Sequence, residues 1–323
     1  MRLSVVIPCY NVQDQLPGLV HSLRANAGNE FEFIFVEDCS TDDTPAVLPE
    51  LVDGLPGADI VWHHRNRGLS AARNTGTARA RGTYLVWLDS DDWIAPGYLA
   101  RLVETIERFD CDFVRTDHVR VLGTQRTIVR SPEWRRHAVL DPRTAIAPAF
   151  RSTSVDYPNA WAGIQHRRLA EDGLLTFDED LRTCEDRHWI WRLHLGAKSF
   201  ATVGLLGVFY RQGLAGSLSH VSNPTQLHFL DAMDRVLEEV LADPDADLLA
   251  IKAVDAYCAL IGFHVAKRAR LSVELQEQLI ARCSARLRSM PADLLTRALA
   301  GTAPERRRLL HRLRDDRGLR AVA

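Results

Sequence analysis

Three carboxylates stand at the end of an apolar run in the first hundred residues. Residues 84–88 read as a buried strand, and Asp89, Asp91 and Asp92 follow within four positions. Like charges this close repel each other, and buried acids need partners. Oxygen ligands suit a hard cation such as Mg²⁺ or Mn²⁺. The spacing predicts either a metal site or a solvated acidic turn. An EF-hand is disfavoured because the required glycine and closing glutamate are missing.

A second acidic pair, Glu185 and Asp186, opens a helical pattern in which Trp189, Ile190 and Leu193 share one face. Thr183 is the expected N-cap, which places both acids in the first turn. Acidic residues there stabilise a helix end by less than about 2 kcal/mol. Plain capping is therefore one interpretation of the pair, and a functional carboxylate is the other.

The elements that position these groups alternate along the chain. Strands are predicted at 3–7, 31–36, 59–62 and 83–88, and helices at 16–23, 44–52 and 70–80. This order predicts an α/β fold, with a mainly parallel sheet covered by helices on both faces. Such a sheet binds ligands beyond the carboxyl ends of its strands.

Polar groups gather at those strand ends. Tyr10 is suited to stack on a base, Asp38 to accept from a base N–H, and Arg73 and Asn74 to reach phosphate or the aspartates. No G-x-G-x-x-G follows the first strand, so the usual dinucleotide fingerprint is absent. These groups predict a nucleoside diphosphate held through a cation. The remaining rim residues are Pro8, Cys9, Asn11, Glu37, His63, His64, Arg65, Asn66 and Ser90.

Four ordered motifs carry a family resemblance: SVVIPCYN at 4–11, VEDCSTDDT at 36–44, NRGLSAARNTG at 66–76 and LDSDD at 88–92. The chain resembles the family 2 inverting glycosyltransferases of the GT-A (Rossmann-like) fold, closely over residues 1–116 and more loosely to about 220. The resemblance implies a hexosyltransferase-like enzyme that uses a nucleotide-sugar donor with Mn²⁺ or Mg²⁺ at a D-x-D motif.

The resemblance also implies roles for single residues. Asp38 contacts the base, Asp89 lies near the ribose, Asp91 binds the metal, and Asp186 of the Glu185–Asp186 pair is the catalytic base. Further implied nucleotide-sugar contacts are Pro8, Tyr10, Asn11, Asn66, Arg73, Ser90 and Arg211, and further implied metal ligands are Asp89 and His220. Arg211 and His220 lie in the segment 210–220, which an ordinary loop before a capping Ser222 explains equally well.

The sequence departs from the family pattern at three positions. Glu37 stands where the family usually has aspartate, and Cys39 and Cys184 stand at common glycine positions. UDP is the carrier that the family favours, while the changes at Glu37 and Cys39 leave GDP and dTDP open. Two other functions remain open: a non-catalytic nucleotide-sugar sensor or assembly subunit, and a sugar-nucleotide nucleotidyltransferase. The latter is disfavoured because no glycine-rich basic loop follows the first strand.

The expected organisation is a catalytic domain at 1–222 followed by a helical region at 223–323. Residues 1–116 form the donor half and 117–222 the acceptor half, with a hairpin around Gly123, a loop-like stretch at 130–158 and a strand at 200–210. Helices are predicted at 227–241, 246–269, 273–287 and 294–313. The basic C-terminal end fits a homodimer contact, an anionic membrane surface or a solvated helix.

Composition sets the remaining expectations. The formal net charge of −2 gives no reason to expect nucleic acid as a partner. Six scattered cysteines without a C-x-x-C pair indicate reduced thiols. The sequence contains no run of 18 apolar residues, and we therefore expect no transmembrane helix. We expect a cytoplasmic protein, with peripheral contact at the inner face of the membrane as an option, and an acceptor that is a carbohydrate, a lipid-linked sugar or a small molecule.

Overall fold

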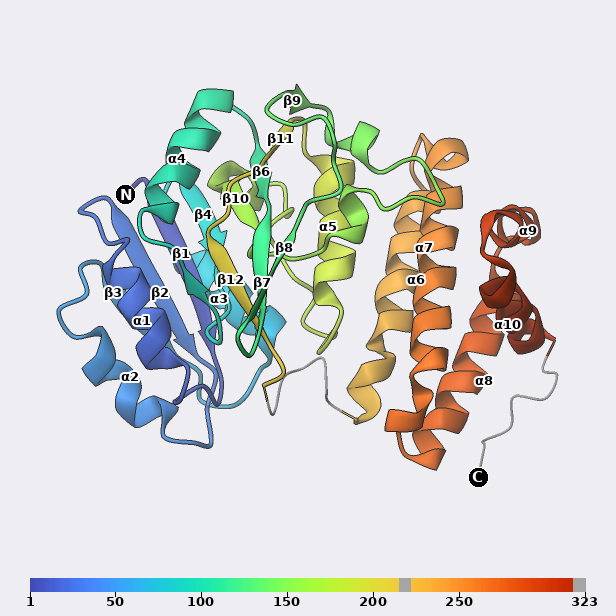
Figure 1. Cartoon of the computed structure of the whole chain (residues 1–323), viewed down its shortest axis with the longest axis horizontal. Coiled ribbons are helices and arrows are strands. Elements are labelled where there is room, and N and C mark those ends of the chain that lie inside the picture. Colours follow the sequence, from blue (N-terminus) through green and yellow to red (C-terminus); the bar gives the residue numbers. More distant parts are fainter. Residues whose placement is uncertain (215–221, 316–323) are drawn as a thin grey trace.

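The computed structural model describes residues 1–214 and 222–315. Its first part alternates strand and helix as predicted (Figure 1), so the α/β fold class is confirmed. The elements in order are β1 (Leu3–Cys9), α1 (Leu16–Arg24), β2 (Phe31–Glu37), α2 (Thr44–Val52), β3 (Ala58–Trp62), α3 (Leu69–Arg79) and β4 (Tyr84–Trp87).

The main sheet is mixed and mainly parallel, with the strand order β3-β2-β1-β4-β10-β6-β11-β9. β1 pairs in parallel with both β2 and β4, whereas β10 runs antiparallel to β4 and β6. The carboxyl ends of β1, β2, β4 and β6 therefore meet at one rim. The later strands are β6 (Phe113–Thr116), β9 (Val139–Leu140), β10 (Gly163–His166) and β11 (Phe200–Val203).

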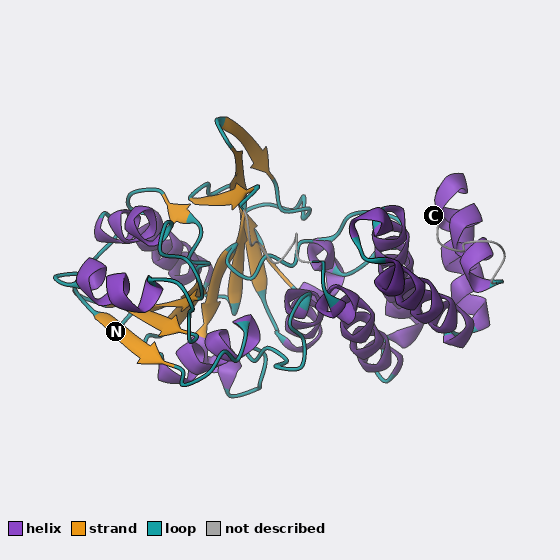
Figure 2. Ribbon diagram, turned by 90° about the horizontal axis from the view of Figure 1, so that it is seen from below, coloured by secondary structure: helices purple, strands orange, loops and turns teal. Residues whose placement is uncertain are grey.

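A smaller sheet of four strands, in the order β5-β12-β7-β8, stands beside this rim. Its strands are β5 (Trp93–Ile94), β7 (His118–Leu122), β8 (Gln125–Val129) and β12 (Val208–Gln212). The predicted hairpin around Gly123 is confirmed as β7–β8, and Figure 2 shows a strand pair projecting from the body of the protein.

The single strand predicted at 200–210 is wrong, because β11 and β12 belong to different sheets. The chain turns at residues 204–207, and the backbone N–H of Ala95 donates to the Gly207 carbonyl at the start of the second sheet. Any side chain at Gly207 would overlap the Tyr98 ring. The close approach of the chain to Tyr98 therefore requires glycine at position 207, inside an otherwise apolar run.

Helices cover both faces of the main sheet. Every residue of β1 is buried, with Val6 facing one hydrophobic cluster and Val5 and Ile7 the other. This is the pattern expected of a strand with both faces covered. The first cluster includes residues of α3 and α5 (Glu185–Gly196), and the second those of α1, α2 and α4 (Tyr98–Phe109).

The C-terminal region is helical, as predicted. The predicted helix 294–313 is two helices, because Pro304 begins a new one after a break at Thr302 and Ala303. The helices are α6 (His228–Leu241), α7 (Ala246–Ala266), α8 (Val273–Ser289), α9 (Ala292–Gly301) and α10 (Pro304–Arg314). Short 3₁₀ helices occur at Pro142–Ala145, Ser154–Asp156, Arg167–Ala170, Pro224–Leu227 and Arg268–Arg270. The first two lie in the predicted loop-like stretch 130–158.

The C-terminal helical region shares a hydrophobic core with the α/β part of the chain. Trp189 and Leu193 of α5 and Phe229 and Leu230 of α6 belong to the same buried cluster, which extends to Leu310 of α10. Figure 1 shows α6 beside α5, and α7 beside α6.

Within the described residues, α7 is the helix that is long and apolar enough to cross a membrane by length and composition. Its mean hydropathy is 1.6, and 56% of the window is buried inside the protein. It packs against α6, α8, α9 and α10. A core helix gives the same signal, and this packing accounts for it here.

Candidate donor and catalytic site

Arg73 joins the two acidic segments singled out by the sequence. Its Nη2 donates to Asp89 Oδ1 at 2.9 Å, and its Nη1 donates to Glu185 Oε1 at 2.8 Å. Arg73 is 2% exposed, and its guanidinium carbon lies 5.0 Å from the centre of the Phe177 ring. The carboxyl end of β4 is thus fixed to the first turn of α5, although Arg73 and Glu185 are far apart in sequence.

The acidic turn after β4 contains three carboxylates in different surroundings. Asp89 is paired with Arg73, whereas Asp92 is buried and accepts from the Arg211 backbone N–H at 2.7 Å. Burial, together with the charges of Asp91 and Asp89, raises the pKa of Asp92. Burial first, and then the charge of Asp89, raises the pKa of Asp91 to about 6. Asp91 is therefore the carboxylate of the turn that is left for an external cation. Ser90 is buried beside these carboxylates.

The Asp38 carboxylate organises the loop after β3. Its Oδ1 accepts from His63 Nδ1 at 2.6 Å and from the Arg67 backbone N–H at 2.8 Å. Its Oδ2 accepts from the Gly68 backbone N–H at 2.7 Å and from Asn66 Nδ2 at 3.0 Å. A carboxylate has about four acceptor positions, so all are used within the chain. The predicted contact of Asp38 with a base would require exchange of one of these bonds, and that contact stays a prediction.

The first motif places its residues on both sides of the rim. Pro8 lies in β1 opposite Val36 of β2. Tyr10 is 44% exposed beside the strand end, where its ring is open to stacking. Asn11 accepts from the Thr41 backbone N–H at 2.8 Å, so it fastens the first two motifs to each other.

The two cysteines at common glycine positions share a backbone conformation. Cys39 has φ of 58° and Cys184 has φ of 61°, in the left-handed region that side chains disfavour. Glu37 supports the first turn, because its carboxylate accepts from the backbone N–H groups of Cys39 and Ser40. These turns explain in physical terms why glycine is common there.

The start of α5 differs from the prediction. Cys184, not Thr183, occupies the N-cap position, and Thr183 Oγ1 donates to the Thr225 carbonyl at 2.6 Å. The threonine hydroxyl is used to bind the helical region rather than to cap the helix. Glu185 and Asp186 still lie in the first turn, as expected.

Glu185 and Asp186 are neighbours with different roles in the structure. Glu185 is buried and paired with Arg73, and burial and the charge of Asp186 raise its pKa. Asp186 is partly exposed. Burial raises the pKa of Asp186 as well, while Arg187 and Arg73 act in the opposite direction. Of the pair, Asp186 is the carboxylate that a substrate can reach.

The sequence reasoning missed a group of aromatic and basic residues on the acceptor side. Tyr210 stacks on Trp161 with ring centres 5.2 Å apart, and burial and the three aspartates of the turn raise its pKa to about 12. His118 meets the same Trp161 edge-on at 4.8 Å. The Arg115 guanidinium lies 5.3 Å from the ring centre of Tyr157, which stacks on His118. The signal in the sequence was a single arginine inside the apolar strand 113–116.

Three other predicted residues have local roles or fall outside the described chain. Asn74 bonds the backbone of Phe177 through both its amide atoms, and its contact with phosphate or the aspartates stays a prediction. The Arg211 guanidinium lies 4.9 Å from the centre of the Trp93 ring, beside the acidic turn. His220 and its predicted metal role lie outside the described residues. Within those residues, no cluster of three or more acidic, histidine or cysteine groups forms a complete metal site.

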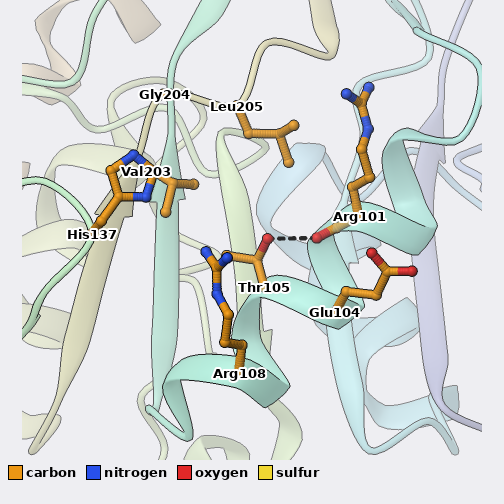
Figure 3. A pocket seen from close by; sticks show the side chains of 8 residues that line it. All are labelled: Arg101, Glu104, Thr105, Arg108, His137, Val203, Gly204 and Leu205. Atoms are coloured by element: carbon orange, nitrogen blue, oxygen red, sulfur yellow. Dashed lines mark hydrogen bonds between the residues drawn. The ribbon is translucent and has the colours of Figure 1, made fainter.

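A cavity of about 480 Å³ lies away from this site, between α4 and the segment that follows β11 (Figure 3). Arg101, Glu104, Thr105 and Arg108 of α4 line one side of it, with His137 and residues 203–205 opposite. It contains none of the predicted site residues, and the Thr105 hydroxyl within it donates to the carbonyl of Arg101.

Comparison with known proteins finds relatives in sequence and in fold. The model of the family described as Glycosyl transferase family 2 matches residues 4–171. The uncharacterized glycosyltransferase EpsJ of Bacillus subtilis is 32% identical over 57% of this chain and 53% of its own length, so the match spans about half of that relative. The succinoglycan biosynthesis protein ExoO of Rhizobium meliloti is 30% identical over 77% of this chain and 71% of its own length.

A solved structure shares the fold. The crystal structure of Staphylococcus aureus TarS 1–349 in complex with UDP-GlcNAc superposes with a TM-score of 0.76 and 21% identity, covering 98% of this chain and 88% of that one. The likeness extends through the C-terminal helices as well as the α/β part.

Proposed function

The chain belongs to glycosyltransferase family 2, and we propose that it transfers a sugar from a nucleoside diphosphate donor, with UDP as the carrier, to an acceptor hydroxyl with inversion at the anomeric carbon. The observation that carries this proposal is the pair of ion contacts made by Arg73. They hold Asp89 of the donor motif and Glu185 next to Asp186 on one buried guanidinium. These contacts support the proposal, because a donor site and a base have to lie close together for transfer.

An inverting transfer needs only one base at this position. In an inverting transfer the acceptor oxygen attacks the anomeric carbon as the bond to the diphosphate breaks, and Asp186 takes the proton of the attacking hydroxyl. No second carboxylate is required as a nucleophile, in contrast to retaining glycosidases. Glu185 cannot serve as this base while Arg73 occupies it, so its role is to hold Arg73 in place.

The residues present fit a divalent cation that is shared with the donor. Asp91 is the carboxylate not taken by the protein, and Mg²⁺ in such enzymes is commonly held by one or two carboxylates together with substrate phosphates. Asp92 Oδ2 is buried without a hydrogen-bond partner among the described residues, which also suits a nearby positive charge. When bound, the cation supplies charge stabilisation to the departing diphosphate.

The test of the donor is calorimetric titration of UDP, GDP and dTDP, each with and without Mn²⁺. We expect metal-dependent binding of UDP in preference to the other two. Binding of GDP or dTDP instead would replace the carrier and keep the enzyme class. Absence of binding for all three would favour a non-catalytic assembly subunit.

The acceptor proposal rests on the relatives. ExoO is named for succinoglycan biosynthesis, and TarS is named as a poly(ribitol-phosphate) β-N-acetylglucosaminyltransferase. We place the acceptor of this chain among carbohydrate polymers or their lipid-linked precursors. A screen of such acceptors with radiolabelled UDP-GlcNAc, with the Asp186→Asn variant as background, tests the assignment.

The basic α10 offers a means of reaching a lipid-linked acceptor at the inner membrane face. Arg308 and Arg312 are exposed one turn apart on one side of the helix, whereas Leu310 and Leu313 of the same helix are buried. Anionic surfaces attract such a basic face. In a flotation experiment with phosphatidylserine vesicles, the native protein should float with the lipid, and a variant with these two arginines changed to glutamine should stay behind. Sedimentation of both proteins should show whether α10 instead joins two copies of the chain.

A further inference from the structure

His63 joins two elements of the donor half. It follows β3, and its ring lies between Asp38, which follows β2, and Thr75 of α3. The distance from His63 Nδ1 to Asp38 Oδ1 is 2.6 Å, and that from His63 Nε2 to Thr75 Oγ1 is 3.0 Å. An ionised carboxylate only accepts, so Nδ1 carries the proton, and Nε2 of the neutral ring accepts from the threonine hydroxyl. Both ring nitrogens are therefore used within the chain.

The two oxygens of Asp38 are held unequally. Oδ1 accepts from His63 at 2.6 Å and from the Arg67 backbone N–H at 2.8 Å. Oδ2 accepts from the Gly68 backbone N–H at 2.7 Å and from Asn66 Nδ2 at 3.0 Å, which is the longest of the four bonds. The same amide nitrogen also donates to the Asp38 carbonyl at 3.2 Å, and Asn66 is exposed. The Asn66 bond is therefore the one that a ligand can replace at the lowest cost, and replacing it leaves Oδ2 available.

α3 sets the position of both ends of the donor rim. Through Thr75 and His63 it holds Asp38 on the base side. Through Arg73 it holds Asp89 at the acidic turn. The side chains of His63 and Asp38 are 5% and 4% exposed, so water competes little for the bond between them. A recognition group whose orientation is fixed before binding loses less entropy when the ligand binds.

We propose that His63 is a positioning residue for recognition of the donor base: it fixes Asp38 Oδ1, so that Oδ2 accepts from a ring N–H of the base in exchange for Asn66. Uracil has one such N–H on its pairing edge, whereas the corresponding nitrogen of cytosine is unprotonated and repels a carboxylate. The ligand is therefore a nucleotide whose base presents a ring N–H. This inference rests on the proposed use of a nucleoside diphosphate donor.

The test is calorimetric titration of UDP, CDP and inorganic pyrophosphate, each with Mn²⁺, into the native protein, His63→Asn and His63→Gln. Asparagine places its amide nitrogen near the position of Nδ1 and keeps a donor for Asp38, whereas glutamine places its nitrogen near the position of Nε2. We expect His63→Gln to raise the Kd for UDP about tenfold, because a hydrogen bond to a charged group is lost. The preference for UDP over CDP should narrow in parallel, while the Kd for pyrophosphate stays unchanged. His63→Asn should keep most of the native affinity for UDP.

His166 provides the matched control. It lies in β10 opposite Tyr84, at the end of β4 remote from the acidic turn, and its Nδ1 accepts from the Arg168 backbone N–H at 3.1 Å. His166→Gln should leave all three Kd values unchanged. Equal affinity for UDP in the native protein, His63→Asn and His63→Gln would overturn the proposal, and so would an equal loss of UDP and pyrophosphate binding in His63→Gln. Absence of binding of all three ligands to the native protein would instead overturn the donor proposal and this inference with it, so the two failures are distinguishable.

Discussion

Glu185 and Asp186 show how two adjacent carboxylates acquire different tasks. One turns inward to Arg73 and becomes part of the framework, while the other stays partly exposed at the rim. The difference is created by Arg73, which is distant in sequence. Which of the two carboxylates is buried and which is exposed therefore depends on the folded structure and not on the local sequence pattern.

Changing Asp186 to asparagine should remove transfer and keep donor binding. The amide has the same shape but cannot take a proton, so we expect kcat to fall by about 10²–10⁴-fold. The Kd for UDP with Mn²⁺, measured by calorimetry, should change little. Glu185→Gln is the informative companion, because it weakens the hold on Arg73 and should impair donor binding as well. Loss of UDP binding in Asp186→Asn would contradict the assignment of the base.

Mn²⁺ binding should depend on pH through Asp91. Its pKa in the metal-free protein is raised to about 6 by burial and by Asp89, and a metal binds the deprotonated carboxylate. We expect the affinity for Mn²⁺ in the presence of UDP to fall as the pH drops through 6. In Asp91→Asn the metal-dependent part of UDP binding should be lost at every pH. A native profile that stays flat from pH 5 to pH 8 would be evidence against Asp91 as the ligand.

At the residue scale, the sequence predicted which groups lie at the rim but not which of them are already occupied. Asp38 is a conspicuous polar residue after β2, yet its four acceptor positions are filled by residues 63–68. Arg115 was not identified, because its hydrogen-bond partners lie 42 and 44 residues away in sequence. Contacts over such separations leave no periodic signal in the chain.

At the scale of elements, the residue that precedes the first turn of α5 has a left-handed backbone conformation. Cys184 has φ of 61°, and this conformation costs an ordinary side chain about 1–2 kcal/mol. The helix therefore starts at a position better suited to glycine. The sequence showed a cysteine at a common glycine position, and the structure supplies the reason for that preference.

Replacing Cys184 by glycine should relieve this strain. We expect Cys184→Gly to be more stable than Cys184→Ala by about 1 kcal/mol. Both variants lose the thiol, but only glycine adopts a positive φ without a steric cost. Free energies of unfolding from urea titrations give the comparison. Equal stability of the two variants would mean that the left-handed turn carries no strain.

The helices and strands predicted best are those with a strong local pattern of apolar residues. The alternation of β1 to β4 with α1 to α3 follows from apolar runs and turn residues alone. The division of 200–210 between two sheets follows from the approach of Gly207 to Tyr98, which only the packed structure reveals. The same holds for Thr183, whose hydroxyl bonds a carbonyl of the following region instead of capping α5.

At the scale of the whole molecule, the helical region completes the core of the catalytic part. A chain truncated after residue 222 would expose the apolar face of α5, where Trp189 and Leu193 are buried. We expect it to aggregate or to lose cooperative unfolding. The comparison is with the full chain, in which Leu310 and Leu313 of α10 close the same core. Cooperative melting of the 1–222 fragment would show that its core is self-sufficient.

The junction between α5 and α6 limits how this chain can be recombined with its relatives. Thr183 hydrogen-bonds Thr225, and His188 of α5 hydrogen-bonds Glu239 of α6. The C-terminal helical region therefore supports the helix that contains Asp186. A chimera spliced at residue 223 would join α5 of one protein to the supporting surface of another. To introduce a new C-terminal region without displacing Asp186, the crossover has to lie before α5, so that the helix and the region that supports it come from the same protein.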